Sequence, residues 1–406
     1  MVYKVIGLMS GSSLDGLDIA YVHLSAVHLS ASTKGISSAP GTSSVLGTSS
    51  APGTSSTPGT SPVSQGSSTN SRAWEFQLMH TACHPYSAEW RDRLAGAAGL
   101  SAFDYQLLHV EYGHYLGREV SRFIAAHGLE YQVQLIASHG HTALHCPARR
   151  MTAQLGDGAA IAAETRINVV SDLRAMDVAL GGQGAPIVPI GEGMLWGEYA
   201  LLLNLGGIAN VSRPPFAFDV APANRVLNAL AGDAGLAYDK DGMMAAAGRV
   251  DEGLLERLNA LPYYGMGYPK SLANEFGLNE VLPLVRGAGL SVADALRTYV
   301  EHLVVQIGRA VEVPGFSPSS SAPAMQMLVT GGGAHNSFLV GRLRARLAEL
   351  GVEIVVPGAA IVDYKEALVM ALIGVLRWRE ENNVLASVTG ASRDSIGGAV
   401  WIGQEI

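Results

Sequence analysis

The chain has 406 residues, of which 48% are hydrophobic and 15% charged, and its formal net charge is −8. This length allows two domains of ordinary size, each with a substantial apolar core. No apolar run approaches the ~20 residues that a membrane-spanning helix needs, and no secretory pattern opens the sequence, so we expect a cytoplasmic protein without a membrane partner. The negative charge argues against nucleic acid as a partner, because clustered Lys and Arg hold phosphate backbones.

The chain contains only two cysteines, Cys83 and Cys146. Two thiols are too few for a disulfide framework or a cysteine-based metal cluster, which fits a reducing compartment. We expect both side chains in the core rather than in a catalytic role.

The N-terminal stretch is predicted to be a hairpin, in which apolar runs at 2–9 and 19–24 flank a turn rich in Gly, Ser and Asp. Glycines let the main chain approach a ligand, and free amides with hydroxyls form a phosphate cradle. Carboxylates would repel a bare polyphosphate, so they indicate Mg²⁺, held by Asp15 directly or through water. An ordinary Gly-Ser turn is the alternative for this motif alone. The residues predicted to bind ATP here are Gly11, Ser12, Ser13, Leu14, Asp15, Gly16, Leu17 and Asp18.

A low-complexity segment occupies residues 25–72, in which the sequence of residues 37–44 recurs unchanged as residues 49–56. Such a composition cannot bury enough apolar surface to fold, so we expect a disordered insertion between two strands. The entropy of loop closure grows only logarithmically with length, so the fold tolerates it. A docking tail is the functional alternative. A smaller segment, residues 317–323, is interpreted in the same way.

Strands and helices then alternate along the first half. After a third strand at 73–83, the pattern predicts helices at 88–94, 103–126 and 159–165, the last capped by Asp157, and strands at 133–136 and 169–171. Such alternation predicts α/β layers with a largely parallel component, where ligands gather at the carboxyl ends of strands.

A second unit begins near Tyr199 and repeats the design of the opening hairpin. The strand at 200–205 ends in a glycine turn, and the strand at 216–220 delivers Asp219 near its end. The remaining predicted elements are a helix at 292–311, a strand at 325–330, a third glycine turn at 331–336, a helix at 337–350, a strand at 352–356 and a long helix at 365–382.

Two α/β halves that each open with a strand, a phosphate turn and a strand resemble the actin, hexokinase and Hsp70 superfamily. More narrowly, the chain resembles the anhydro-N-acetylmuramic acid kinase family over nearly its whole length except the two low-complexity segments. The motifs that carry this resemblance are residues 7–18, 138–140, 154–156, 171–174, 177, 181–189, 204–212, 219, 269–271, 331–334, 366–367 and 389–391.

The resemblance implies an α/β fold, namely a two-domain actin-like (ribonuclease H-like) ATPase fold with an ATP cleft between the domains. Residues 1–195 with 380–406 would form the first domain, and residues 196–379 the second. The implied reaction hydrolyses the 1,6-anhydro bond of 1,6-anhydro-N-acetylmuramic acid and phosphorylates O6 with ATP and Mg²⁺, as in peptidoglycan recycling. A homodimer is also implied. The alternatives are a kinase for another anhydrosugar or hexose, and an ATP-binding module that has lost catalysis.

The resemblance also assigns roles to single residues. Asp219 matches the family's general base, against the alternative of a structural Asp, and Glu366 would position the sugar or the water, against a favourable helix-dipole position. Arg174 would pair with the lactyl carboxylate, against the alternative of a surface ion pair. The other assigned residues are Asp177, His139 and His141 toward the sugar, Gly206, Gly207 and Asn210 at the β- and γ-phosphates, and Gly331, Gly332 and Gly333 at the adenosine.

The chain departs from the family pattern around the expected base. Ala221 and Ala223 stand where glycines are usual, and Asn228 replaces an acidic residue. If those glycines require positive φ, each alanine costs about 1 kcal/mol or more. The other departures are Ser12 for Thr, His141 for Gln, and residues 272–274 for Thr-Gly-Arg.

Overall fold

A computed structural model describes residues 1–11, 14–27, 73–213, 216–267, 270–273, 275–314, 316 and 324–403. The predictions for Ser12, Ser13 and Pro269 therefore lie outside the described residues, as do those for residues 28–72 and 317–323 of the low-complexity segments.

The first half is built on a six-stranded sheet with the order β13-β7-β4-β1-β2-β3. Strands β1, β2 and β3 form an antiparallel meander, β4 runs parallel to β1, and β7 runs parallel to β4. The bounds are β1 Val2–Ser10, β2 Gly16–Ala26, β3 Trp74–Pro85, β4 Leu135–Ser138, β7 Asn168–Ser171 and β13 Ala399–Trp401.

The second half contains a five-stranded sheet with the order β10-β9-β8-β11-β12. Its first three strands, β8, β9 and β10, are again an antiparallel meander. Strand β11 runs parallel to β8, and β12 runs parallel to β11. The bounds are β8 Leu201–Leu205, β9 Ile208–Arg213, β10 Phe216–Pro222, β11 Met325–Thr330 and β12 Val352–Val355. One strand order is thus repeated in both halves, and the predicted two-domain actin-like fold is confirmed.

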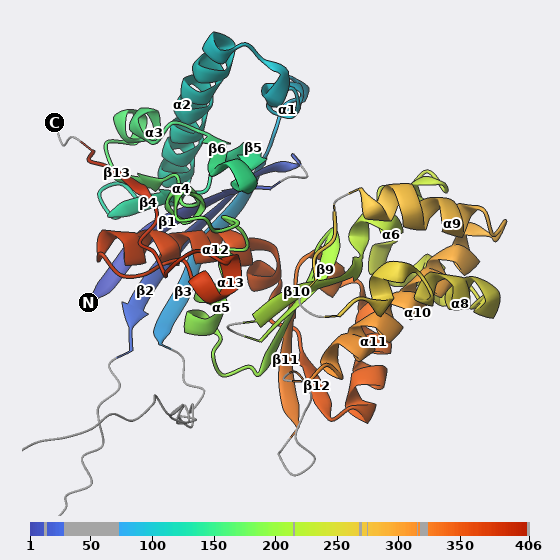
Figure 1. The fold of residues 1–406 in the computed structure, drawn as a ribbon. Coiled ribbons are helices and arrows are strands. Elements are labelled where there is room, and N and C mark those ends of the chain that lie inside the picture. Colours follow the sequence, from blue (N-terminus) through green and yellow to red (C-terminus); the bar gives the residue numbers. More distant parts are fainter. Residues whose placement is uncertain are drawn as a thin grey trace, which may run out of the picture.

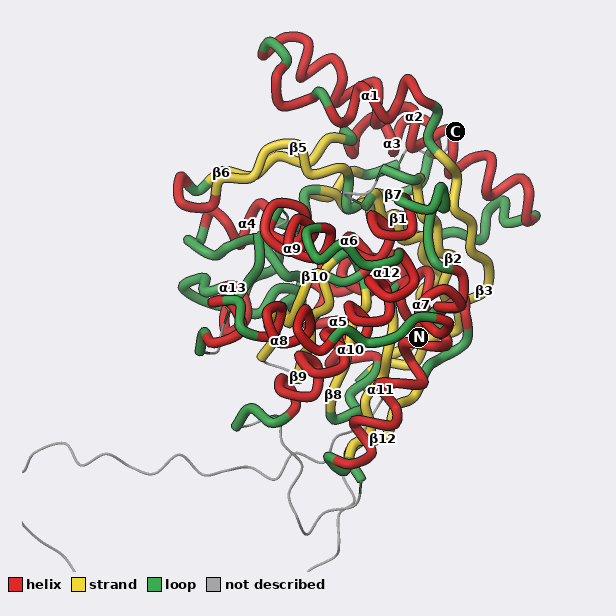
Figure 2. Tube along the Cα trace, turned by 90° about the vertical axis from the view of Figure 1, so that its right-hand side faces the viewer, coloured by secondary structure: helices red, strands yellow, loops and turns green. Residues whose placement is uncertain are grey.

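Helices cover both faces of the first sheet (Figure 1). Because side chains alternate along a strand, Ile6 packs toward α2 and α3, whereas its neighbour Val5 packs toward α5 and α12. The bounds of the first-half helices are α1 Ala88–Ala95, α2 Ala102–His127, α3 Gly158–Thr165, α4 Ala175–Ala179, α5 Val188–Leu195 and α13 Ala386–Thr389. Asp157 caps α3 as predicted, by accepting a hydrogen bond from the Ala160 amide. A separate ribbon of β5 His141–Cys146 and β6 Met151–Leu155 lies beside α4 (Figure 2).

Helix α12, Ala359–Trp378, joins the two halves. It packs on β1, β2 and β4, and it also contacts β11 of the second sheet. Its core cluster accordingly includes Leu202 and Leu328 from the second half. The predicted domain limits stay a prediction. Because α12 packs on the first sheet, we expect the chain to return to the first half before α12, and not after it at residue 380.

The long helix differs from its predicted bounds at both ends. It begins at Ala359 and bends at Tyr364 (φ −113°, ψ 15°), next to the predicted start at 365. It ends at Trp378 instead of 382, because Glu380 takes a left-handed conformation with φ 58°. Glu366 therefore lies just after a bend, and not in the first turn of the helix.

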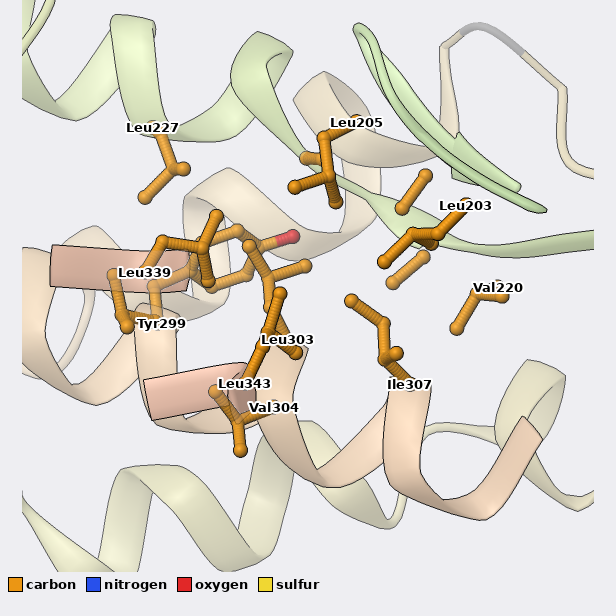
Figure 3. Close-up of a cluster of buried hydrophobic side chains, with 14 of the residues drawn as sticks. Leu203, Leu205, Val220, Leu227, Tyr299, Leu303, Val304, Ile307, Leu339 and Leu343 are labelled. Atoms are coloured by element: carbon orange, nitrogen blue, oxygen red, sulfur yellow. The ribbon is translucent and has the colours of Figure 1, made fainter. Parts of the chain in front are cut away.

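The core of the second half lies between its sheet and helix α10, Val292–Val311. Figure 3 shows Leu203, Leu205 and Val220 from the sheet facing Leu303 and Ile307 of α10. The bounds of α10 and β11 agree with the predicted 292–311 and 325–330. The other helices are α6 Asn224–Gly232, α7 Met243–Ala247, α8 Glu252–Asn259, α9 Leu282–Arg286 and α11 Ser337–Glu349.

The expectation that both cysteines lie in the core is wrong. Cys83 is exposed on β3, and Cys146 is only half-buried. None of the helices in the described part of the chain has the length and apolar composition needed to cross a bilayer.

Candidate active site

A row of polar residues crosses the second sheet. Asp219 on β10 is paired with Asn210 on β9, and Asn210 is paired in turn with Asn204 on β8. Thr330 at the end of β11 continues the row beside Asn204. Because directly paired residues of neighbouring strands point to the same face, these four side chains share one side of the sheet. The predicted base and a predicted phosphate ligand are thus neighbours.

The second and third glycine turns lie against each other beside this row. Gly331 has a φ of +80°, and a Cβ at this position would lie 2.5 Å from Asn204 Oδ1. A Cβ on Gly333 would lie 2.7 Å from the Leu205 Cβ. Only glycine permits this close approach. The fold therefore brings together the predicted phosphate and adenosine residues of the second half.

The carboxylate of Asp219 is held by the segment after residue 269. The Leu272 amide donates to Asp219 Oδ2 at 2.9 Å, and the Asp219 amide donates to the Lys270 carbonyl at 3.2 Å. The Tyr263 hydroxyl donates to the Asp219 carbonyl at 2.7 Å. Burial raises the pKa of Asp219, and the Leu272 amide opposes this rise. Both the strand and the carboxylate are therefore fixed in place.

The alanines around Asp219 do not take the left-handed backbone conformation that would strain an alanine. Neither Ala221 nor Ala223 has a positive φ, and that of Ala223 is −118°. Both side chains are fully buried, whereas Asn228 is exposed on α6. The anticipated cost of alanine at a left-handed position does not arise here.

Arg174 is held by two acceptors in the first half. Its Nε donates to His139 Nε2 at 2.8 Å, and its Nη1 donates to the Gly184 carbonyl at 2.6 Å. The other ring nitrogen of His139, Nδ1, donates to the Gly140 carbonyl at 2.8 Å. Burial and the Arg174 charge lower the pKa of His139 to about 3, so this ring stays neutral at pH 7. His139 thus orients Arg174 in this structure.

Asp177 fixes the glycine loop that follows Arg174. Its side chain is fully buried, with Oδ2 accepting from the Gly184 amide at 2.7 Å. The Thr389 hydroxyl donates to Oδ1 at 2.6 Å. Both carboxylate oxygens are therefore engaged by the protein, and Gly184 is shared between Asp177 and Arg174.

Two buried polar atoms beside His139 have no hydrogen-bond partner among the described residues: Ser138 Oγ and His141 Nδ1. Buried polar atoms in folded proteins are nearly always paired, because an unpaired one costs free energy. These two atoms therefore mark a place where a polar ligand is expected.

Carboxylates gather where the first turn meets α12. The pKa of Asp18 is raised to about 6, mainly by burial and also by the charges of Glu366, Asp363 and Asp15, while a hydrogen bond with Cys83 opposes the rise. Burial lowers the pKa of Arg174 to about 10, and Glu366 and Asp177 oppose that shift. Glu366 thus acts electrostatically on both the first turn and Arg174.

Residues 67–403 match the sequence profile of the family described as anhydro-N-acetylmuramic acid kinase. This match spans most of the chain. The chain belongs to this family.

Relatives of the same name agree with this assignment. An anhydro-N-acetylmuramic acid kinase of Vibrio parahaemolyticus serotype O3:K6 is 31% identical over 401 residues, or 96% of this chain and 95% of the relative. One from Streptomyces coelicolor is 39% identical over 290 residues, or 67% and 71%. Among solved structures, the ADPNP-bound activator of 2-hydroxyisocaproyl-CoA dehydratase from Clostridium difficile aligns with a TM-score of 0.36 and 14% identity, over 65% of this chain and 81% of that one.

As a member of the anhydro-N-acetylmuramic acid kinase family, the chain is an ATP-dependent sugar kinase with a small-molecule sugar substrate. Ser138 and Asn204 belong to motifs that carry the family resemblance but had no predicted role, and Thr330 was not predicted to belong to the site. All three stand at or near the end of an apolar strand. Ser138 directly precedes His139, Thr330 directly precedes Gly331, and Asn204 is two residues before Gly206, so the position at a strand end was the available signal.

Proposed function

We propose that this kinase adds water across the 1,6-anhydro bond of 1,6-anhydro-N-acetylmuramic acid and phosphorylates O6, giving N-acetylmuramic acid 6-phosphate for cytoplasmic peptidoglycan recycling. The observation that supports this most is the pairing of Asp219 with Asn210. The reaction needs a base that takes a proton from water and a group that binds the transferred phosphate, both next to the same sugar. This pairing puts a candidate for each role on neighbouring strands.

In the proposed step, Asp219 takes a proton from the attacking water. The water oxygen bonds to the anomeric carbon, the bond from that carbon to O6 breaks, and O6 takes the γ-phosphoryl group while ADP leaves. Burial favours proton uptake by Asp219, and the Leu272 amide keeps its carboxylate oriented. Positioned general bases contribute about 10²- to 10⁴-fold to the rate.

We assign the sugar subsite to the region around Arg174. The guanidinium, fixed by His139 and Gly184, would pair with the lactyl carboxylate of the sugar. Asp177 and His139 support this arrangement, and the unpaired Ser138 and His141 atoms would meet sugar hydroxyls. Glu366, close enough to act on Arg174, would position the sugar or the water.

The ATP subsite would use the three glycine turns. Residues 11–18 together with Gly206, Gly207 and Asn210 would hold the phosphates, and residues 331–333 the adenosine. The described residues contain no group of three or more His, Cys, Asp or Glu side chains placed to bind a metal ion, so Mg²⁺ would be held by Asp15, directly or through water, together with the phosphates of ATP. Mg²⁺ in such sites typically takes one or two carboxylates plus phosphate oxygens. When bound, it would neutralise charge on the transferred phosphoryl group.

We also propose two domains, one that begins with residues 1–195 and one that begins at residue 196, with the return to the first domain placed before α12 instead of at residue 380, because α12 packs on the first sheet.

We propose in addition that the protein is a homodimer. Three large apolar side chains of α2 are exposed at helical spacing: Phe103 (77%), Leu107 (46%) and Val110 (38%). A second copy would cover this row, since exposed apolar rows on soluble proteins often mark interfaces. Leu107→Glu should convert a dimer to a monomer in light scattering, whereas Tyr131→Glu, at another exposed position, should not. A parent protein that is already monomeric would refute the dimer.

The function is tested by ADP release with Mg²⁺ and ATP, with and without 1,6-anhydro-N-acetylmuramic acid. The expected product carries the added mass of one water and one phosphoryl group. The matching sugar without the lactyl group, 1,6-anhydro-N-acetylglucosamine, should react with a higher KM because Arg174 loses its partner. Faster ADP release with that sugar or with a hexose would contradict the proposed substrate.

A further inference from the structure

A buried ion pair lies at the junction of the two halves. Lys365 Nζ donates to Glu192 Oε1 at 2.6 Å, and the Ser212 hydroxyl donates to Glu192 Oε2 at 3.0 Å. The exposed fractions of Lys365, Glu192 and Ser212 are 3%, 5% and 4%. These residues come from α12, α5 and β9, so the cluster ties the connecting helices to the second sheet.

Stability alone gives little reason for such a pair. Desolvating two charges costs several kcal/mol per ion, and replacing a buried pair by apolar residues is often neutral or stabilising. The neighbouring packing is apolar and close: a Cβ on Gly191 would lie 2.6 Å from Val369 Cγ1, so α5 and α12 are in contact beside the pair. An apolar pair would therefore suit the surroundings, and the charges call for another explanation.

Two of the three members of the cluster lie within two residues of a residue with a proposed role. Lys365 directly precedes Glu366 and directly follows the bend at Tyr364. Ser212 follows Asn210 by two residues on β9, so both side chains point to the same face of the strand. The ion pair thus connects the start of the straight part of α12 to the strand that carries a proposed phosphate ligand.

We propose that Lys365 and Glu192 are positioning residues: their ion pair fixes the orientation of Glu366 and, through the Ser212 hydroxyl, couples it to the β9 strand that carries Asn210. A charged, hydrogen-bonded pair has one preferred geometry, whereas an apolar contact can slide. This inference rests on the proposed roles of Glu366 and Asn210, because the cluster contacts neither substrate.

The first experiment separates an effect of the ion pair on the orientation of Glu366, measured as kcat, from its effect on the stability of the fold. Lys365→Met leaves Glu192 buried without its partner, so it should lower the thermal midpoint as well as kcat. In the double variant Lys365→Met/Glu192→Leu, the midpoint should recover toward the parent value while kcat stays at least tenfold low. If kcat recovers together with the midpoint, the pair is merely structural and the proposal is overturned.

The second experiment uses milder changes and a readout that needs no sugar. Ser212→Ala keeps the ion pair but removes one hydrogen bond to Glu192, so it should lower the thermal midpoint less than Lys365→Met does, and it should weaken ATP binding at least threefold. Ser212→Thr, which keeps the hydroxyl, should restore ATP binding. The control is the exposed pair Arg286 and Asp233, where Arg286→Met should change nothing. ATP affinity of Ser212→Ala equal to that of the parent would refute the coupling. Absence of sugar-dependent ADP release in the parent would instead refute the proposed function, and the ATP readout would remain valid.

Discussion

Asp219 and Asn210 are directly paired between β10 and β9, so their side chains lie next to each other on one face of the second sheet. The residues are nine positions apart in the chain and lie on consecutive strands. This pairing places a carboxylate beside an amide that follows a glycine turn, which is the relationship that the proposed reaction needs between its base and its phosphate site.

Asp219→Asn should lower kcat by about 10³-fold or more while the Kd for ATP stays within twofold of the parent value. An asparagine still accepts the Leu272 amide hydrogen, so the segment should keep its place, but it cannot take a proton from water. Single-turnover ADP release with sugar, together with ATP titration, measures both quantities. Asp233→Asn on the surface is the matched control. A variant that retains more than a tenth of parental kcat would exclude Asp219 as the base.

Ala221→Gly should destabilise the protein by about 0.5–1 kcal/mol without raising kcat. Ala221 is fully buried on β10 and has no positive φ, so glycine relieves no left-handed strain and adds freedom to the unfolded chain. Urea unfolding and steady-state kinetics provide the comparison with Ala223→Gly, which should cost less because the φ of −118° and ψ of −102° at Ala223 lie outside the helical and extended regions. A large gain in kcat would show that the methyl group obstructs the substrate.

Asp18→Asn should remove a decline in stability between about pH 4 and pH 6. Because the folded pKa of Asp18 is raised to about 6 from 3.8, the unfolded chain loses its proton first as pH rises, and stability falls through this window. At pH 7 the variant should be about 1 kcal/mol more stable, a value discounted for partial solvent exposure. Urea titrations from pH 4 to 7 measure this, with the exposed Asp92→Asn as control. Parallel pH profiles for parent and Asp18→Asn would contradict the assignment.

His302 should make the fold sensitive to acid. Its ring bonds Asn259 Oδ1 and the Tyr264 hydroxyl, and burial lowers its pKa to about 3. Since the unfolded histidine binds its proton near pH 6.5, stability should fall by about 1.4 kcal/mol per pH unit as pH decreases from 6.5 toward 3. His302→Gln should reduce the loss between pH 7 and pH 5 by about 2 kcal/mol, measured by urea unfolding. His114→Gln, at a half-buried histidine outside this core that pairs with Glu164, is the control and should retain most of the parental loss. An unchanged loss in His302→Gln would contradict the prediction.

The sequence by itself determined the elements and their repetition. Helix α10 and strand β11 follow from apolar periodicity, and the cap of α3 follows from Asp157 at a helix start. The glycine turns after apolar strands are signals of the same kind and predict the proposed ATP subsite, because such signals are local and are complete within a few residues.

Only the tertiary structure decided which distant residues meet. Lys365 and Glu192 are 173 positions apart, and Thr389 and Asp177 are 212 apart. Strand pairing and helix packing bring these groups together, and no local pattern encodes the contact. The same holds for His139, whose two ring nitrogens are occupied by Arg174 and Gly140, and for Ala223, whose backbone angles emerge only when α6 docks on the sheet. The sequence shows which side chains can form ion pairs and hydrogen bonds. Their actual partners depend on the packing of segments that are remote along the chain.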